Sequence, residues 1–195
     1  MDTRRTSPDI DTLTIEYRRE CRENGIRKTD REWMHPVLTQ WARTLETGHP
    51  LDDHTSTLTV MLMAHSLPFR DAIILSSLKR FTPTQLLDIA TRQHRKQTVA
   101  LITKTLEEAF ESADYRLDTP RVERASSQLS RFAADYAGEQ WSAQPIASRA
   151  YLSWIQGHTQ AASAGALAAL SVDPECALAS IVFFAVEGNI RPMYL

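Results

Sequence analysis

A run of small residues near the end of the chain places the strongest constraint on the fold. Residues 159–170 read Thr-Gln-Ala-Ala-Ser-Ala-Gly-Ala-Leu-Ala-Ala-Leu, with only two large apolar side chains. Alanine has the highest intrinsic helix propensity, and small side chains at successive turns let a neighbouring backbone approach closely. We therefore predict a helix packed tightly against bulkier neighbours. The helical period puts three alanines on its buried face and two on the opposite face: Ala162, Ala166 and Ala169, and then Ala164 and Ala168.

Helices rich in bulky residues are predicted on both sides of this run. Before it, large apolar residues recur at spacings of three and four up to Trp154, and Gly157 suits the end of a helix. After it, Asp173-Pro174 is typical of an N-cap followed by proline at the first helical position. A third helix then runs to Gly188, and its large apolar residues, which include Leu178, Ile181, Val182 and Phe184, are expected to face the small residues of the middle helix. Residues 141–195 thus form an Ala-rich helical hairpin and a closing helix.

Helix start signals recur through the rest of the chain, and the alternation typical of strands is nearly absent. The predicted starts are Ser7-Pro8, Thr29 with Glu32, Asp52-Asp53, Thr82-Pro83 and Thr119-Pro120. Pro36 should kink its helix or mark the true start. We predict an all-α fold, one domain over residues 1–195 with about eight to ten helices. It comprises charged N-terminal helices (1–48), a helical body (49–140) and the hairpin with its closing helix (141–195).

Composition excludes several classes of protein. The formal net charge of −2 argues against a dedicated nucleic-acid binder, which normally carries a basic excess. Two cysteines at opposite ends of the chain, Cys21 and Cys176, indicate reduced residues of a cytosolic protein. The N-terminus lacks the apolar segment of a signal peptide, and no apolar run approaches the roughly 20 residues that span a bilayer. We expect a cytoplasmic protein without a membrane partner.

The hairpin resembles a tetratricopeptide-type repeat. The positions that carry the resemblance are Gly157, Ala162, Ala169-Leu170 and Asp173-Pro174. The first helix departs from the pattern, because Tyr151 and Trp154 are out of step with the aromatic residues of that family. No repeat period is seen upstream, and one repeat cannot bury its own apolar face.

A second resemblance covers about residues 51 to 192. Residues 150–157 (Ala-Tyr-Leu-Ser-Trp-Ile-Gln-Gly), residues 169–174 (Ala-Leu-Ser-Val-Asp-Pro), Gly188 and Arg191-Pro192 are similar to the actinobacterial domain-of-unknown-function family 4192. An Arg-Asp pair of that family looks like Arg70-Asp71. Members usually carry an α/β half ahead of this region, and we see no trace of its pattern in residues 1–50. The resemblance implies that a separately encoded α/β protein is a candidate partner.

Five residues are candidates for a binding site: Asp52, Asp53, Arg70, Asp71 and Trp154. Asp52 and Asp53 are placed to cap a helix, and Asp71 to complement the dipole of the next helix. Arg70 can bridge to one of the two preceding aspartates. The alternative, an Arg70-Asp71 pair that lines a groove between helices, rests mainly on the family resemblance.

The sequence gives little support for a metal site, a catalytic site or a nucleic-acid site. His54 and His65 could share a helix face, but no zinc-ligand spacing occurs, so we expect no metal and no cofactor. Nucleophile and phosphate-loop motifs are absent, and we expect no catalytic activity. The basic run Arg92, His94, Arg95 and Lys96 could contact phosphates together with N-terminal arginines, although it lacks interleaved aromatic residues.

The sequence therefore favours a helical protein-interaction module over its alternative, a nucleic-acid accessory protein. Its partner would be a second copy of the chain or another protein, and we do not expect nucleic acid as the main partner. The aromatic residues expected on the surface are Trp33, Trp41, Trp141 and Tyr194.

Overall fold

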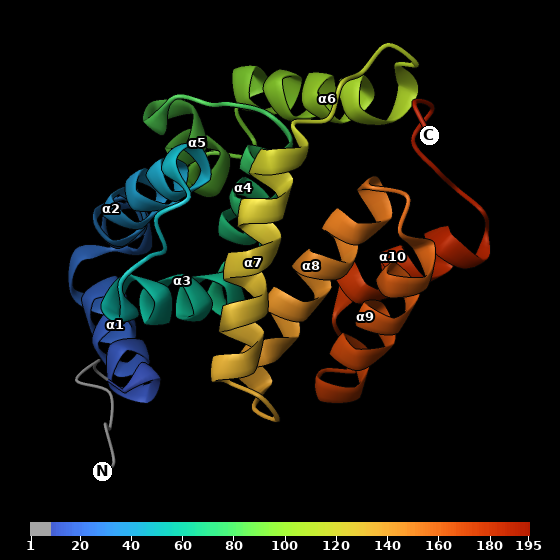
Figure 1. Cartoon of the computed structure of the whole chain (residues 1–195). Helices are drawn as coiled ribbons and strands as arrows, with labels where there is room; N and C mark the ends of the chain where they lie inside the picture. Colours follow the sequence, from blue (N-terminus) through green and yellow to red (C-terminus); the bar gives the residue numbers. More distant parts are fainter. Residues whose placement is uncertain (1–8) are drawn as a thin grey trace.

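The computed structural model describes residues 9–195, which form ten α-helices and one short 3-10 turn, without a β-strand (Figure 1). In chain order they are α1 (Ile10–Asn24), α2 (Ile26–Thr47), α3 (Asp53–His65), α4 (Leu67–Leu78), α5 (Pro83–Thr91), α6 (Lys96–Glu111), α7 (Thr119–Asp135), the 3-10 turn η1 (Gln140–Ser142), α8 (Ala143–Ile155), α9 (Thr159–Val172) and α10 (Ala177–Glu187). The predicted all-α single domain is confirmed.

Helix α4 lies at the centre of the molecule. It contacts α2, α3, α5, α6, α7 and α8, and nine of its 12 residues are buried. A helix that is covered on all sides is apolar nearly all round, which explains the run Ala-Ile-Ile-Leu at residues 72–75. Within residues 9–195 no single helix is long and apolar enough to cross a membrane, although α3 and α4 together, bent by 118°, have the length and composition to do so.

The Ala-rich helix α9 packs as its residue pattern predicts. Ala162, Ala166 and Ala169 are fully buried, whereas Ala164 and Ala168 are exposed. Helix α9 lies against α8 and α10, and these three helices form one end of the molecule beyond α7 (Figure 1). The approach of α8 is close at Gly165, where an added Cβ would lie 3.0 Å from the Cβ of Ala150 and 3.5 Å from its Cα. The predicted close-packing face is therefore confirmed.

The chain after α10 returns along α8 to the end of α6 (Figure 1). The Trp154 indole N–H donates to the Ile190 carbonyl oxygen at 2.8 Å, and the Tyr194 hydroxyl donates to the Ile155 carbonyl oxygen at 2.5 Å. The Met193 N–H donates to the carbonyl oxygen of Phe110 at 2.9 Å. These bonds fasten the last residues to α6 and α8.

Most helix start signals are confirmed, and two are wrong. The Asp52 side chain caps α3, Thr82 and Gln85 form a complete capping box, and α7 begins at Thr119. Helix α2, however, begins at Ile26 directly after Gly25, so Thr29 is a buried helical residue and not a cap. Pro36 also lies inside α2 and does not mark its start. The Ser7-Pro8 signal lies outside the described residues.

The other wrong signal is Asp173-Pro174. These residues form a turn after α9, in which the Asp173 side chain accepts a hydrogen bond from the Glu175 N–H at 3.0 Å. Helix α10 begins three residues later, at Ala177. An aspartate followed by proline suits a turn as well as a helix start, because the side chain accepts a local N–H in both.

Two of the four aromatic residues expected on the surface are buried. Trp41 is completely buried, and its indole N–H donates to the Ser76 hydroxyl at 2.9 Å, so its polar atom is satisfied inside the core. Trp141 is 8% exposed and packs against the His65 ring, with centroids 5.9 Å apart. Trp33 and Tyr194 are only partly buried. Cys21 and Cys176 are both free cysteines.

We predict that Ala166→Leu destabilises the protein by about 1–3 kcal/mol, because a larger side chain must force the tight α8–α9 contact apart. In a chain of this size, each kcal/mol lowers the melting temperature by roughly 2–4 °C. Thermal unfolding followed by circular dichroism measures the shift.

The matched control is Ala168→Leu, on the exposed face of the same helix. It should change the melting temperature little. Equal shifts for the two variants would show that Ala166 is not part of a close-packing face.

Candidate functional site

Arg70 and Asp71 form an ion pair that faces α8, and Arg70 does not bridge to Asp52 or Asp53 as expected. The Arg70 Nη2 lies 2.6 Å from the Asp71 Oδ1, and its Nη1 donates to the side-chain oxygen of Gln144 at 3.2 Å. Asp71 is the fifth residue of α4 and lies beyond the first turn, so the expected role at the helix dipole is also wrong. Arg70 is 8% exposed and its bonds tie α4 to α8.

A thiol and a phenol lie close to this ion pair. The side-chain nitrogen of Gln144 lies 3.7 Å from the sulfur of Cys176. Burial raises the pKa of the Cys176 thiol above its ordinary value, which keeps it protonated. Burial, with the charge of Asp71, also raises the pKa of the Tyr151 hydroxyl. A raised pKa keeps both groups in the protonated form, which is the weaker nucleophile.

Asp52 and Asp53 lie at the start of α3, apart from the Arg70–Asp71 pair. The Asp52 carboxylate accepts hydrogen bonds from the N–H and the hydroxyl of Thr55, both at 2.8 Å. The Thr55 N–H holds the pKa of Asp52 below its ordinary value despite partial burial. Asp53 is exposed in the first turn of the helix. The predicted capping role of Asp52 is confirmed.

Trp154 is a core residue. It is 6% exposed, and its ring packs against the rings of Phe110 and Tyr151 at centroid distances of 5.0 and 5.5 Å. Its N–H is bonded to Ile190, so it offers a partner neither a surface nor a free donor. The five residues predicted as a binding site therefore belong to three separate structural contacts.

The basic run of the sequence lies at a cleft of about 560 Å³, which we call the basic cleft. Its lining comes from the start of α2, the α3–α4 junction and the α5–α6 connection: Arg27, Asp30, Arg31, Ser66, Pro68 and residues 90–95. The structure thus brings Arg92, His94 and Arg95 together with two of the N-terminal arginines. Lys96 begins α6 outside the lining, and the arginines of α1 do not contribute.

His65 lines a second cleft, of about 360 Å³, with Arg18, Gln144 and Asp173. Its ring is stacked on Tyr17 at a centroid distance of 6.1 Å, and its buried Nε2 has no hydrogen-bond partner within residues 9–195. Burial, with the nearby charge of Arg18, holds the pKa of His65 below its ordinary value. Among residues 9–195, no three His, Cys, Asp or Glu side chains come close enough to hold a metal ion.

The outer side of α10 carries an exposed apolar row, which we call the α10 stripe: Ala177, Ile181, Phe184, Gly188 and Ile190. The first four residues recur at helical spacings, so they share one face. Phe184 and Ile181 are 68% and 57% exposed. Asn189 has a φ of 53°, which turns the chain back so that Ile190 lies 3.7 Å from where a Gly188 Cβ would be.

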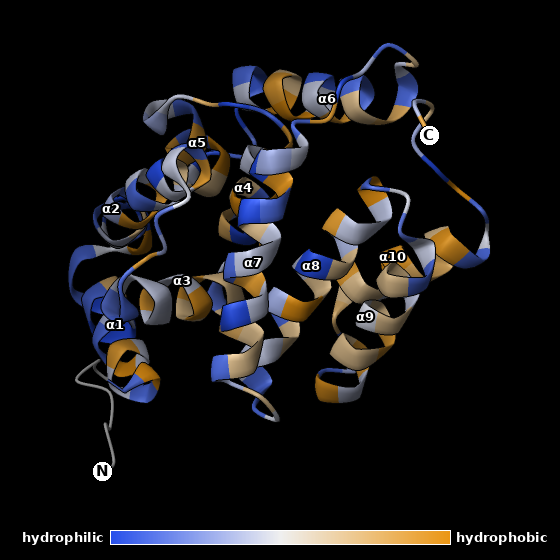
Figure 2. Cartoon of the chain, viewed as in Figure 1, coloured by the Kyte–Doolittle hydropathy of each residue, from blue (hydrophilic) through white to orange (hydrophobic). Residues whose placement is uncertain are grey.

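Charge is nearly absent around the α10 stripe. Helices α9 and α10 have 14 and 11 residues, and Glu187 is their single ionisable side chain. Figure 2 shows the contrast, with these helices mostly orange and pale and the N-terminal helices largely blue. A solvated surface helix normally carries charged residues on its outer face. Sequence analysis missed the stripe because it assigned Ile181 and Phe184 to the packed face of the hairpin.

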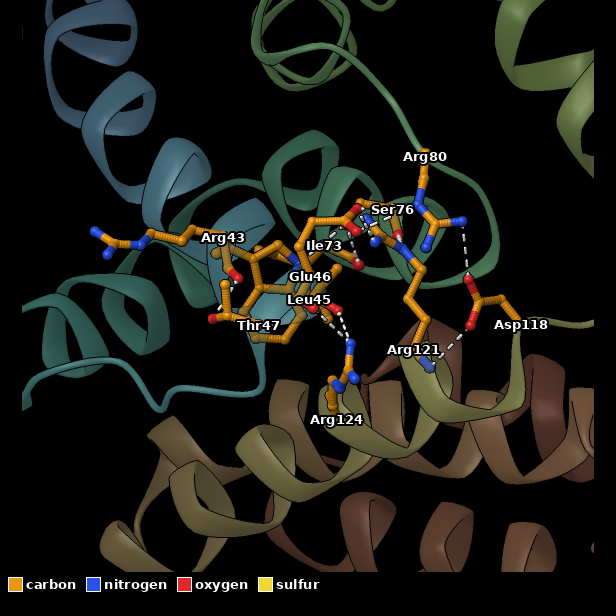
Figure 3. Close-up of polar contacts among 11 residues, drawn as sticks. Arg43, Leu45, Glu46, Thr47, Ile73, Ser76, Arg80, Asp118, Arg121 and Arg124 are labelled. Carbon is orange, nitrogen blue, oxygen red and sulfur yellow. Dashed lines mark hydrogen bonds and ion pairs between the residues drawn. The ribbon is translucent and has the colours of Figure 1, made fainter.

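Sequence analysis did not single out Arg121, which lies in the first turn of α7 and bonds to two other helices (Figure 3). Arg121 is 2% exposed. Its Nε donates to the Ser76 carbonyl oxygen of α4 at 2.6 Å, and its Nη1 donates to the Glu46 carboxylate of α2 at 2.5 Å. One guanidinium therefore joins three helices.

Further arginines and one aspartate surround this contact, and we call the group the Arg121 cluster: Glu46, Ser76, Arg80, Asp118, Arg121 and Arg124. Arg80 pairs with both Glu46 and Asp118, and Asp118 also caps α7. Arg124 donates to the carbonyl oxygens of Leu45 and Glu46 at 2.8 Å, near the end of α2. These bonds are internal to the fold, and they mark the cluster as a structural junction.

We predict that Arg121→Met destabilises the fold by about 1.5–3 kcal/mol, the usual contribution of hydrogen bonds to a charged group. Methionine replaces the aliphatic stem but leaves the Ser76 carbonyl oxygen without this donor. Urea unfolding measures the loss. Arg43→Met is the control, because the Arg43 side chain points away from the cluster in Figure 3, and its effect should stay within about 0.5 kcal/mol. Similar losses in both variants would contradict the structural role of Arg121.

A pH dependence follows from Glu46. Burial raises the pKa of Glu46, but the hydrogen bonds and charges of Arg121 and Arg80 outweigh it and hold the pKa below its ordinary value of 4.5. A carboxylate with a lowered pKa stabilises the folded state above its unfolded pKa, and that contribution is lost as the pH falls through the folded pKa. The stability difference between the wild type and Glu46→Gln should therefore shrink on acidification below about pH 4. A constant difference in urea titrations over this range would contradict the ion pair.

Comparisons with known proteins do not assign the chain to a family. No family model, no curated protein and no solved structure matches the chain. The similarity of residues 51–192 to domain-of-unknown-function family 4192, and of the hairpin to a tetratricopeptide-type repeat, stays a prediction.

Proposed function

We propose that this protein is a helical protein-interaction module that binds a second copy of itself through the α10 stripe. The observation that carries the proposal is the exposure of Ile181 and Phe184 on α10, which together with α9 has one ionisable side chain. Exposed contiguous apolar surface marks interaction sites, and the centres of protein interfaces are depleted of charge.

The low charge of the α10 stripe favours a second copy of the chain as the binding partner. A two-fold symmetric interface places the same patch of each subunit against itself, so a patch with net charge repels its own image. The α10 stripe itself has no charged side chain, and Glu187 is the single ionisable residue of α9 and α10, so this repulsion is small. The packing of α10 also favours a second copy of the chain. Helix α10 lies against α8 and α9 on its inner side, and its outer row of apolar side chains is exposed.

We predict that the protein dimerises in a concentration-dependent manner and that Phe184→Ser weakens the dimer by about tenfold or more, because large central aromatic residues contribute most to interface energy. Sedimentation equilibrium over a range of protein concentrations measures the dissociation constant. Ile181→Ser should weaken it in the same direction.

The control is Ile15→Ser on α1, because Ile15 and Phe184 are both 68% exposed. This variant should dimerise as the wild type does. A monomer at every concentration would refute self-association, and binding of a purified α/β protein through Phe184 would replace the second copy with that partner. Equal weakening by Ile15→Ser and Phe184→Ser would remove the stripe from the interface.

A further inference from the structure

The basic cleft brings together arginines that are far apart in the sequence. Arg27 and Arg31 come from the first turns of α2, whereas Arg92 and Arg95 come from the connection between α5 and α6. The α3–α4 junction completes the lining with Ser66 and Pro68. A volume of about 560 Å³ lies within the range of small-molecule sites.

Most of this positive charge is not neutralised within the protein. Arg92 pairs with Asp88 at 3.2 Å, but within residues 9–195 Arg27, Arg31 and Arg95 form no salt bridge. Of the residues that the structure describes, Asp30 is the only carboxylate in the lining, and it accepts a hydrogen bond from the Tyr17 hydroxyl at 2.5 Å. Four arginines thus face one carboxylate in a protein whose net charge is −2. Like charges around one cavity repel, and a bound anion relieves that repulsion.

The start of α6 adds to the positive potential. Arg95 is the N-cap of this 16-residue helix, and no side chain caps the backbone N–H groups of its first turn. Uncapped N–H groups and the positive end of the helix dipole favour an anion. Guanidinium groups match the geometry of phosphate oxygens, with which they form paired hydrogen bonds.

We propose that the basic cleft binds a small molecule that carries phosphate groups, a site that is separate from the α10 stripe. A compact ligand fits better than a nucleic acid for two reasons. The charge is gathered in one cavity and does not extend to Lys96, and among the described residues the lining holds no Phe, Tyr or Trp side chain on which a base could stack.

The test is calorimetric titration of the full chain with sodium tripolyphosphate at low salt, since about 0.1 M salt screens exposed charges beyond roughly 10 Å. Saturable binding to one site is expected, and Arg31→Gln and Arg95→Gln should each weaken it by about tenfold. The matched control is Arg43→Gln, an exposed arginine of α2 outside the cleft, which should bind as the wild type does. Because Arg31 and Arg95 form no salt bridge in the described part of the chain, both variants should keep the melting temperature of the ligand-free protein.

Four results would overturn the proposal. They are no binding of tripolyphosphate, equal weakening by Arg43→Gln, citrate binding as tightly as tripolyphosphate, and binding of a DNA oligonucleotide without binding of tripolyphosphate. The third would replace phosphate recognition with simple charge attraction. The fourth would show that this surface serves a nucleic acid.

Discussion

The buried guanidinium of Arg121 is the contact on which the assembly of the helical body depends. It bonds the Ser76 carbonyl oxygen of the central helix α4 and the Glu46 carboxylate of α2, and it belongs to α7. A buried charge without partners would cost several kcal/mol, so these bonds hold α7 at one position on α2 and α4. The same Ser76 accepts the indole N–H of Trp41 through its hydroxyl, which places the polar junction beside the largest core side chain. Hydrogen bonds have strict distance and angle requirements, so these bonds limit how far α7 can shift on α2 and α4.

The arrangement of the helices around this junction produces two distinct surfaces, the α10 stripe and the basic cleft. Helix α7 separates the N-terminal helices from α8, α9 and α10, which stand as a layer at one end of the molecule (Figure 1). That layer packs through small residues, and its outer row is the α10 stripe. The start of α2 meets the α5–α6 connection, which creates the basic cleft. The charged and the uncharged surface thus belong to different parts of the fold, and one can be altered without the other.

Local physical rules account for what could be predicted from the sequence. Helical periodicity separates Ala162, Ala166 and Ala169 from Ala164 and Ala168, because three to four residues make a turn whatever lies around the helix. Capping at Asp52 and Thr82 depends on residues three positions apart. Periodicity identifies a face but not its partner, so Ile181 and Phe184 were expected inside the hairpin and are exposed. Arg121 could not be found this way, because its partners Ser76 and Glu46 are 45 and 75 residues distant. Sequence analysis identified the basic run from Arg92 to Lys96 and the N-terminal arginines, but it did not predict that members of both sets line one cleft.

Native-state hydrogen exchange tests the central claim, that the Arg121 junction makes α2, α4 and α7 one cooperative unit. We expect the core amides of these three helices to share one free energy of opening, because no one of the helices can separate without breaking the same buried bonds. Amides such as those of Leu38, Ile73 and Leu129 should therefore exchange only through one common opening. The account would be contradicted if α7 exchanged through a lower-energy opening while α2 and α4 stayed protected.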